Sequence, residues 1–399
     1  NKKSPAVLTA GDFLFSKFSS VPLGLFNKMA LLPQLGKVSS FFPVSVRSKA
    51  RCQEVIHRDP DLNILPALKT WPFDGGHFIT LPMVHTIDPI NGQRNVGMYR
   101  MQLYNKDTTG MHWHRHKTGA RHFELYKELG KKMPVAVALG GDPVLTYSAT
   151  APMPDNMDEY ILAGFLREKP VKLVKCITQD LEVPADAEII IEGYIDPEED
   201  LKIEGPFGDH TGFYSLEDHY PVFHVTCITH ASDAVYPATI VGTPPQEDAW
   251  MAKATEKIFF FPIQKTIVPE IIDMELPDFG VAHNLTIIKI NKRYPGQAVK
   301  VMNSLWGAGQ MMFNKVMIVI DQNTNITNEK NLFYALRKIN PDTDLHLSSG
   351  PLDVLDHSTE HTGFGGKLGI DLTMKLPGEE RKTGNHSLNS SSERYTISD

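Results

Sequence analysis

Residues 285–320, LTIIKINKRYPGQAVKVMNSLWGAGQMMFNKVMIVI, contain two apolar runs separated by a segment with helical spacing. The runs 285–290 and 316–320 are rich in Ile and Val and have the length of buried strands. Between them, residues 296–308 predict a helix. A strand, a helix and a second strand in this order predict a mostly parallel sheet, which places the chain in the α/β class, with mixed α+β character overall.

The rest of the chain changes character along its length. Two more helices are predicted close to this unit, over 249–258 and 329–338. Upstream, short apolar runs predict strands over 78–81, 96–103, 134–139, 172–177, 188–195 and 221–229, with helices over 120–132 and 155–167. We therefore expect a partial N-terminal region (1–75), a β-rich domain (76–247), a C-terminal α/β domain (248–380) and a Ser/Asn-rich mobile tail (381–399).

Composition narrows the class of protein. The chain has 399 residues, of which 41% are hydrophobic and 22% charged, as in folded globular proteins of two or three domains. A net charge of −7 argues against a nucleic-acid surface, which needs a basic face. Three widely separated cysteines fit a reducing compartment, and no apolar run is long enough to span a bilayer. These features predict a cytoplasmic protein without a transmembrane segment.

Asn95-Val-Gly-Met-Tyr-Arg100 is the first segment that could contribute to a site. An Arg among apolar strand residues needs an anionic partner, which can be a ligand or simply a carboxylate of the protein. Five residues apart on a strand, Asn95 and Arg100 point to opposite faces unless Gly97 introduces a bulge.

His112-Trp-His-Arg-His116 is the second segment, and Lys117 follows it. On a strand, His112, His114 and His116 would share one face, which suits a metal or a phosphate. The alternative is polar surface. Trp113, on the opposite face, is interpreted as part of the core or as a platform for a planar ligand.

Glu204-Gly-Pro-Phe-Gly-Asp-His-Thr-Gly212 is the third segment. Paired carboxyl groups in a buried site separate their pKa values, so that Glu204 or Asp209 could hold the proton that a general acid needs. The alternative is a polar turn. Two other acids, Glu188 and Glu192, are interpreted as the solvated edge of a strand. Glu159 is interpreted as part of a charge cluster at a helix start, where Asp155 or Asn156 could cap the helix.

Taken together, these segments resemble the UbiD family of decarboxylases, which includes 4-hydroxy-3-polyprenylbenzoate decarboxylase of quinone biosynthesis. The matching stretches occur in the family's order and are 95–100, 111–117, 134–143, 152–164, 174–176, 180–193, 204–212 and 365–367 with Asp371. The resemblance implies a central split β-barrel that binds prenylated FMN, with Mn²⁺ or another divalent metal and a K⁺ ion at the flavin phosphate.

The resemblance also assigns roles to individual residues. It implies that Arg100, Glu204 and Asp209 perform the chemistry and that Asn95, His116 and Glu159 bind the metal. The residues that it places against the flavin are Met98, Tyr99, Arg100, His112, Trp113, His114, Lys117 and Lys367. One departure is an Asp at 209 where some branches have Glu, which tilts the expected substrate toward hydroxybenzoates.

The resulting hypothesis is the non-oxidative decarboxylation of a 4-hydroxybenzoate-type acid, with or without a polyprenyl chain, as in quinone biosynthesis. The resemblance further implies a flavin prenyltransferase as cofactor supplier and a homo-oligomer, and a lipophilic substrate would allow peripheral contact with a membrane. The alternative is an FMN-dependent oxidoreductase, since split barrels also hold unmodified flavin. The pair Glu204 and Asp209, which hydride transfer does not need, separates the two. A third hypothesis is a non-catalytic protein that has kept the fold.

Overall fold

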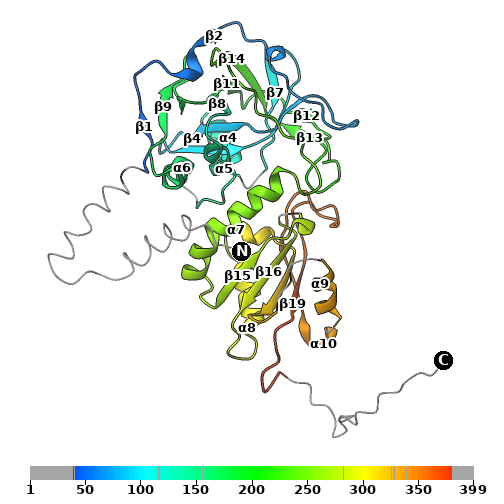
Figure 1. Ribbon diagram of the computed structural model, residues 1–399. Helices are drawn as coiled ribbons and strands as arrows, with labels where there is room; N and C mark the ends of the chain where they lie inside the picture. Colours follow the sequence, from blue (N-terminus) through cyan, green and yellow to red (C-terminus); the bar gives the residue numbers. More distant parts are fainter. Residues whose placement is uncertain are drawn as a thin grey trace, which may run out of the picture.

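The computed structural model describes residues 39, 41–114, 117–154, 157–281, 283–324, 326, 329–337 and 339–379. Figure 1 shows two lobes: a first lobe built from residues 41–246, and a second lobe that begins with the long helix α7 (Glu247–Thr266) at the junction. His116 and the predicted tail 381–399 lie outside the described residues.

The first lobe is organised around an antiparallel sheet with the strand order β2-β14-β11-β8-β4-β5, and β7 also pairs with β14. The strands are β2 (Val55–His57), β4 (Met83–Ile87), β5 (Arg94–Met98), β7 (Thr108–Gly110), β8 (Met133–Leu139), β11 (Ile189–Ile195) and β14 (Val222–His230). Among the described residues this order is an open path rather than a closed ring.

Both faces of this sheet are covered, and the sequence of β8 shows why. Val135 and Val137 face a core that includes Phe123 of helix α4 (Thr118–Glu128). The small residues Ala136 and Ala138 face the opposite core, which α5 (Pro143–Ser148) and α6 (Glu159–Arg167) cover. Because burial on both faces removes the polar alternation of a half-exposed strand, residues 134–139 read as a continuous apolar run.

The first turn of α6 starts later than the sequence suggested. Its N-cap is Asp158, whose carboxylate accepts from the backbone N–H of Tyr160 at 2.9 Å. Asp155 and Asn156, the caps that the sequence predicted, lie outside the described residues. Asp158 also forms an ion pair with Arg94 of β5 at 2.6 Å, which fixes the helix start against the sheet.

Residues before 75 contribute strands to the first lobe. β1 (Val44–Ser45) pairs in parallel with β9 (Lys172–Lys175), which also pairs with β10 (Glu182–Pro184). The short strands β3 (Phe78–Ile79) and β6 (Met101–Gln102) pair with each other, as do β12 (Lys202–Glu204) and β13 (Asp218–Tyr220). Two 3₁₀ turns lie on either side of β2: η1 (Arg51–Gln53) follows β1, and η2 (Leu62–Ile64) precedes β3.

The second lobe contains the predicted strand–helix–strand unit. Its five-stranded sheet has the order β15-β16-β17-β19-β18, with β16, β17 and β19 parallel and both edge strands antiparallel. The strands are β15 (Ile271–Glu275), β16 (Leu285–Ile290), β17 (Val316–Asp321), β18 (Leu345–Pro351) and β19 (Phe364–Asp371); the helices that follow α7 are α8 (Gln297–Trp306), α9 (Glu329–Leu336) and α10 (Pro341–Asp344), with 3₁₀ turns η3 (Asp278–Gly280) and η4 (Gly309–Phe313). The mixed α/β fold class is thus confirmed.

Two local predictions are wrong. Glu192 does not lie on a solvated edge: it is fully buried and accepts from the backbone N–H groups of Ile177 at 2.8 Å and Thr178 at 2.6 Å. Because β11 is a central strand, its residues on both faces are buried. Residues 111–114 form irregular backbone after β7, so His112 and His114 do not share the face of a strand.

In the described part of the chain, no helix is long and apolar enough to cross a membrane.

Candidate active site

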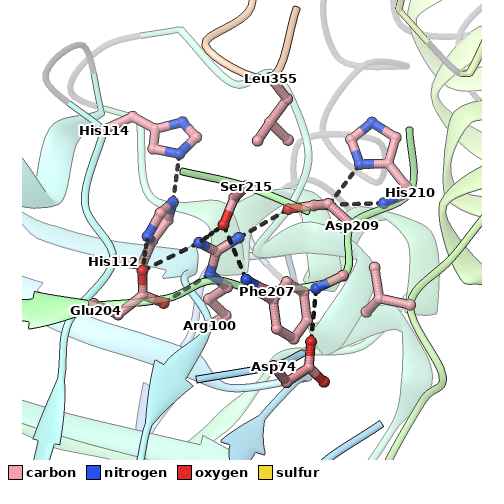
Figure 2. Close-up of polar contacts among 12 residues, drawn as sticks. Asp74, Arg100, His112, His114, Glu204, Phe207, Asp209, His210, Ser215 and Leu355 are labelled. Atoms are coloured by element: carbon pink, nitrogen blue, oxygen red, sulfur yellow. Dashed lines mark hydrogen bonds and ion pairs between the residues drawn. The ribbon is translucent and has the colours of Figure 1, made fainter. Parts of the chain in front are cut away.

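Arg100 lies between β5 and β6 and joins two carboxylates from one distant loop (Figure 2). Its Nε donates to Oε1 of Glu204 at 2.8 Å, and its Nη2 donates to Oε2 of the same carboxylate at 3.1 Å. Its Nη1 donates to Oδ2 of Asp209 at 2.8 Å. The Arg100 side chain is 8% exposed, and a buried cation of this kind requires paired anions. The structure therefore brings together the three residues predicted to perform the chemistry.

The loop that carries both carboxylates is fixed by backbone contacts. Glu204 ends β12, and the next residue, Gly205, has a positive φ of 98° that favours glycine. The Gly205 N–H donates to the side chain of Gln102 at 2.7 Å. Further along, the Gly208 N–H donates to Asp74 at 2.8 Å. The loop is thus held at two points against the segment that carries Arg100.

Two further side chains complete the surroundings of the guanidinium. Ser215 accepts from Nη2 of Arg100 at 2.9 Å and also accepts from the Phe207 N–H at 3.2 Å. The Phe207 ring lies 4.6 Å from the guanidinium carbon, a cation–π contact. Each of the three guanidinium nitrogens of Arg100 therefore donates to at least one protein oxygen.

The charges in this group follow from its contacts. Burial alone would raise the pKa of Glu204, but hydrogen bonds from His112 and Arg100 outweigh it and lower the pKa to about 2. Burial lowers the pKa of His112, whose Nδ1 lies 2.8 Å from Glu204, so this imidazole is a neutral donor. Arg100 thus supplies the positive charge that keeps Glu204 ionised. His114 extends the chain of contacts, with its Nε2 at 2.7 Å from Nε2 of His112.

Asp209 is ionised as well, and the neighbouring His210 carries the proton instead. Burial opposes this, but the hydrogen bond and charge of His210, together with Arg100, lower the pKa of Asp209 well below its usual range. The pKa of His210 rises to about 9, against the effect of burial, because Nδ1 contacts Asp209 at 2.9 Å and Asp248 lies close by. The sequence-based expectation of one protonated carboxyl group is therefore not met by this pair.

Several residues of the second lobe reach the cluster around Arg100 and Asp209. Nε2 of His283, which lies just before β16, is 2.9 Å from Nε2 of His210. Asp353, in the segment between β18 and β19, places its negative charge near His283, His114 and His210, and these groups lower its pKa against the effect of burial. Leu355 from the same segment lies over the group (Figure 2). The site is therefore built at the junction of the lobes.

Two of the predicted metal ligands, Asn95 and Glu159, line one small cavity of about 30 Å³, which is enough for roughly one water-sized ligand. Oε2 of Glu159 accepts from the Val96 N–H at 2.8 Å, and burial raises the pKa of Glu159 to about 7. Thr118, at the start of α4, and Arg121 also line the cavity. Within the described residues, no three His, Cys, Asp or Glu side chains form a metal-binding cluster. Since His116 is outside these residues, the three-ligand metal site stays a prediction.

The residues predicted to bind flavin fall into two places. In the first lobe, Tyr99 is buried and contacts Trp113 edge to face at 6.2 Å, while Met98 ends β5 and Lys117 occupies the N-cap position of α4. Met98 and Tyr99 lie in the sequence between Asn95, at the small cavity, and Arg100. Burial lowers the pKa of Lys117, and Asp353 opposes this effect.

Lys367 lies elsewhere. Its ammonium group donates to the backbone carbonyls of Met312 at 2.6 Å and Asn314 at 2.7 Å, inside the second lobe. The structure does not bring this side chain to Arg100, and its flavin contact stays a prediction.

Several residues at this site were missed by sequence reasoning. His210 belongs to the segment 204–212. Sequence reasoning could have identified it as a basic side chain that directly follows the carboxylate of Asp209. Asp74, Ser215, His283 and Asp353 carry no sequence signal, since each is brought in from a separate segment.

Comparison with protein families covers both lobes. Residues 44–244 match the 3-octaprenyl-4-hydroxybenzoate carboxy-lyase Rift-related domain, and residues 249–372 match the C-terminal domain of the same carboxy-lyase family, UbiD. The chain is also 48% identical to an uncharacterized protein of Aquifex aeolicus, over 89% of this chain and 73% of that protein.

Solved structures agree with these matches. Vanillic acid decarboxylase of Sedimentibacter hydroxybenzoicus in its closed form aligns with a TM-score of 0.79 and 27% identity, over 92% of this chain and 79% of that one. The UbiD-class enzyme HmfF of Pelotomaculum thermopropionicum, in complex with FMN, aligns with a TM-score of 0.75 and 28% identity, over 93% and 83%. An evolved dimeric HmfF in complex with prFMN gives 0.73 and 26%, over 94% and 83%. The chain belongs to the UbiD family of carboxy-lyases.

Proposed function

We propose that this chain removes CO₂ from an aromatic carboxylic acid of the 4-hydroxybenzoate type, using prenylated FMN and a divalent metal. The observation that carries the proposal is the buried bridge from Arg100 to Glu204 and Asp209 at the junction of the lobes. Support comes from two UbiD-class neighbours, one a vanillic acid decarboxylase and one with prFMN bound.

The charges around Arg100 suit an anionic substrate. Glu204 and Asp209 are ionised, while Arg100 and His210 are positive, so these four groups sum to zero. A substrate carboxylate is therefore not repelled by an excess of negative charge, and Arg100 offers it a cationic partner. When that carboxylate competes for the guanidinium, Asp209 loses part of its own charge partner and becomes easier to protonate.

The residues of the first lobe fit a metal and a flavin phosphate. Asn95 and Glu159 offer the hard oxygen ligands that Mn²⁺ or Mg²⁺ prefers, in a cavity of matching size. Thr118 at the start of α4 also lines this cavity, and a helix N-terminus favours anions. Prenylated FMN, when bound, supplies the electron sink that stabilises negative charge on the carbon losing CO₂. The proposal also includes His116 as third metal ligand and a K⁺ ion. It further includes a flavin prenyltransferase that supplies the cofactor, and a cytoplasmic location.

The alternative, hydride transfer by an FMN oxidoreductase, is less well supported. It gives no role to two ionised carboxylates on one guanidinium, and the family match is to carboxy-lyases. We include two further points in the proposal: a role in quinone biosynthesis and a polyprenyl group on the substrate. Both are supported by the description of the family alone.

The experiment is a substrate panel with the cofactor controlled. The chain is purified from cells with and without a flavin prenyltransferase and incubated with 4-hydroxybenzoate, vanillate and cinnamate, while CO₂ release and product are measured. We expect decarboxylation only by the protein that carries prenylated FMN. Asp209→Asn, at matched cofactor content, should lose about 10²–10⁴-fold in rate, the usual contribution of a general acid. Decarboxylation by neither preparation, with reduction of an electron acceptor instead, would favour the oxidoreductase.

A further inference from the structure

We propose that His210 is the proton reservoir of this site: it delivers a proton to Asp209 during each turnover. This inference rests on the proposed decarboxylation, which consumes one proton for each CO₂ released. It gives His210 a role that neither the sequence segments nor the family match assigns to this side chain.

The geometry sets His210 directly behind Asp209. Asp209 divides its two oxygens between two cations: Oδ2 accepts from Arg100 at 2.8 Å, and Oδ1 accepts from Nδ1 of His210 at 2.9 Å. The Oδ1 atom also accepts from the backbone N–H of His210 at 2.8 Å. One oxygen thus faces the guanidinium, while the other is joined to a group that can give up a proton.

The ring of His210 is held from its other side by the second lobe. Its Nε2 lies 2.9 Å from Nε2 of His283, and the two rings meet edge to face at 5.0 Å. His283 is itself fixed, because its backbone carbonyl accepts from the side chain of Asn314 at 2.9 Å. The imidazole is therefore oriented at both nitrogens, and it cannot rotate away from Asp209 without losing both contacts.

The charges around the ring favour its protonated form. Asp209, Asp248, Glu247 and Asp353 place negative charge near it, and His283, whose pKa burial lowers, is the neutral acceptor. These groups outweigh burial, and the pKa of His210 rises to about 9. At neutral pH the proton is thus stored on the imidazole rather than on either carboxylate.

The proton balance of the step is simple. His210 passes its Nδ1 proton to Oδ1 of Asp209, and the carboxylic acid so formed gives this proton to the carbon as the bond to CO₂ breaks. The electron pair of that bond forms the new C–H bond. His210 is left neutral and takes one proton from solvent before the next turnover.

The test compares His210→Asn with a matched control. Asn can still donate a hydrogen bond to Asp209 but cannot carry the proton. His224→Asn alters another histidine that is paired with a carboxylate, Glu199, away from Arg100. At matched cofactor content, we expect the kcat of His210→Asn to fall about 10²–10⁴-fold. Wild-type kcat should decline above about pH 9, as His210 loses its proton, and this decline should be absent in the variant. His224→Asn should behave as wild type.

A second measurement does not require turnover. Nitrogen-15 NMR of labelled histidine rings, with His210 identified from its missing signals in His210→Asn, should show a doubly protonated ring at pH 7.5 that Asp209→Asn makes neutral. A neutral His210 in the wild type, or a kcat of His210→Asn within about twofold of wild type, would overturn the inference. Failure of the wild type to decarboxylate any acid in the panel would instead overturn the proposed function, while the ring titration would still report where the proton is stored.

Discussion

Glu204 shows how much of this site depends on individual charges. It is fully buried, and its carboxylate stays ionised because both oxygens accept from Arg100 and one also contacts His112. A buried carboxylate of this kind ties the stability of the fold to pH, since unfolding returns it to its ordinary pKa.

This dependence gives a prediction for acid conditions. The pKa of Glu204 is about 2 in the folded protein and 4.5 ordinarily, so its contribution to stability is present above about pH 4.5 and is lost as pH falls toward 2. The shift corresponds to roughly 3 kcal/mol. Urea unfolding should show Glu204→Gln less stable than wild type at pH 7, with a difference that shrinks steadily below pH 4.5. Glu124→Gln, on the exposed face of α4, serves as the control. A difference independent of pH would contradict the assignment.

The sequence predicted part of this site at the level of residues. The convergence of Arg100, Glu204 and Asp209 could be inferred, because an Arg in an apolar strand and two carboxylates in a Gly-rich turn each need a partner. The protonation states could not be inferred, since they depend on His210 and on Asp248 from α7. Glu192 was misinterpreted because a carboxylate in a strand suggests solvent, and its buried backbone donors come from another segment.

At the scale of elements, the loop after β12 is held by an unusually close approach of two backbones. A Cβ atom at Gly75 would lie 2.0 Å from the carbonyl oxygen of Gly205, and the Gly75 N–H donates to the Pro206 carbonyl at 2.7 Å. A side chain at position 75 would therefore push away the loop that carries both Glu204 and Asp209.

We accordingly predict that Gly75→Ala damages the site without touching its charges. The backbone must shift, which costs about 1–3 kcal/mol in stability, and a shift near 1 Å is expected to reduce turnover by up to about 10²-fold. Gly366→Ala is the control, because nothing lies within 4 Å of its added Cβ. Urea unfolding and kcat should be measured for both. Equal effects of the two variants on stability and kcat would show that the close backbone approach at Gly75 does not determine the position of the loop.

The sequence predicted whether a segment is a helix or a strand more accurately than it predicted where that segment ends. The predicted helix at 249–258 corresponds to α7, which continues to Thr266 through Pro262. It continues because Phe260 and Ile263 pack against the core of the second lobe, a tertiary contact that local propensity does not contain. The pairing of β1 with β9 was equally hidden, since two residues have no periodicity to detect.

At the scale of the whole molecule, the two lobes share one site. Asp209 and His210 come from the first lobe, and His283 and Asp353 come from the second. Their packing is also supported by contacts farther away, such as the Phe213 ring against His357 at 5.1 Å. Turnover should therefore depend on residues of both lobes, although sequence reasoning placed the chemistry in the first alone.

The edges of the second sheet differ in a way that bears on assembly. The edge strand β15 carries Asp273 and Glu275, and charged residues discourage pairing with another chain. At the opposite edge, β18 has the sequence LHLSSGP, without Lys, Arg, Asp or Glu, and it is exposed at five of its seven residues. Leu347 of this strand is 76% exposed. An uncharged, exposed edge is a surface on which a second copy of the chain can add its own β18 in antiparallel fashion, which closes a two-fold dimer.

We predict that the chain self-associates through β18 and that Leu347→Lys weakens this association. A charge on the edge strand opposes pairing because it would have to be buried or brought close to its own copy. Light scattering after size-exclusion chromatography, at several protein concentrations, should give a lower mass for Leu347→Lys than for wild type. Leu216→Lys is the matched control, since Leu216 is also 76% exposed but lies in the first lobe. A wild-type mass equal to one chain at all concentrations would show that β18 is left unpaired or is covered by the chain's own residues, and an unchanged mass for Leu347→Lys would move the interface elsewhere.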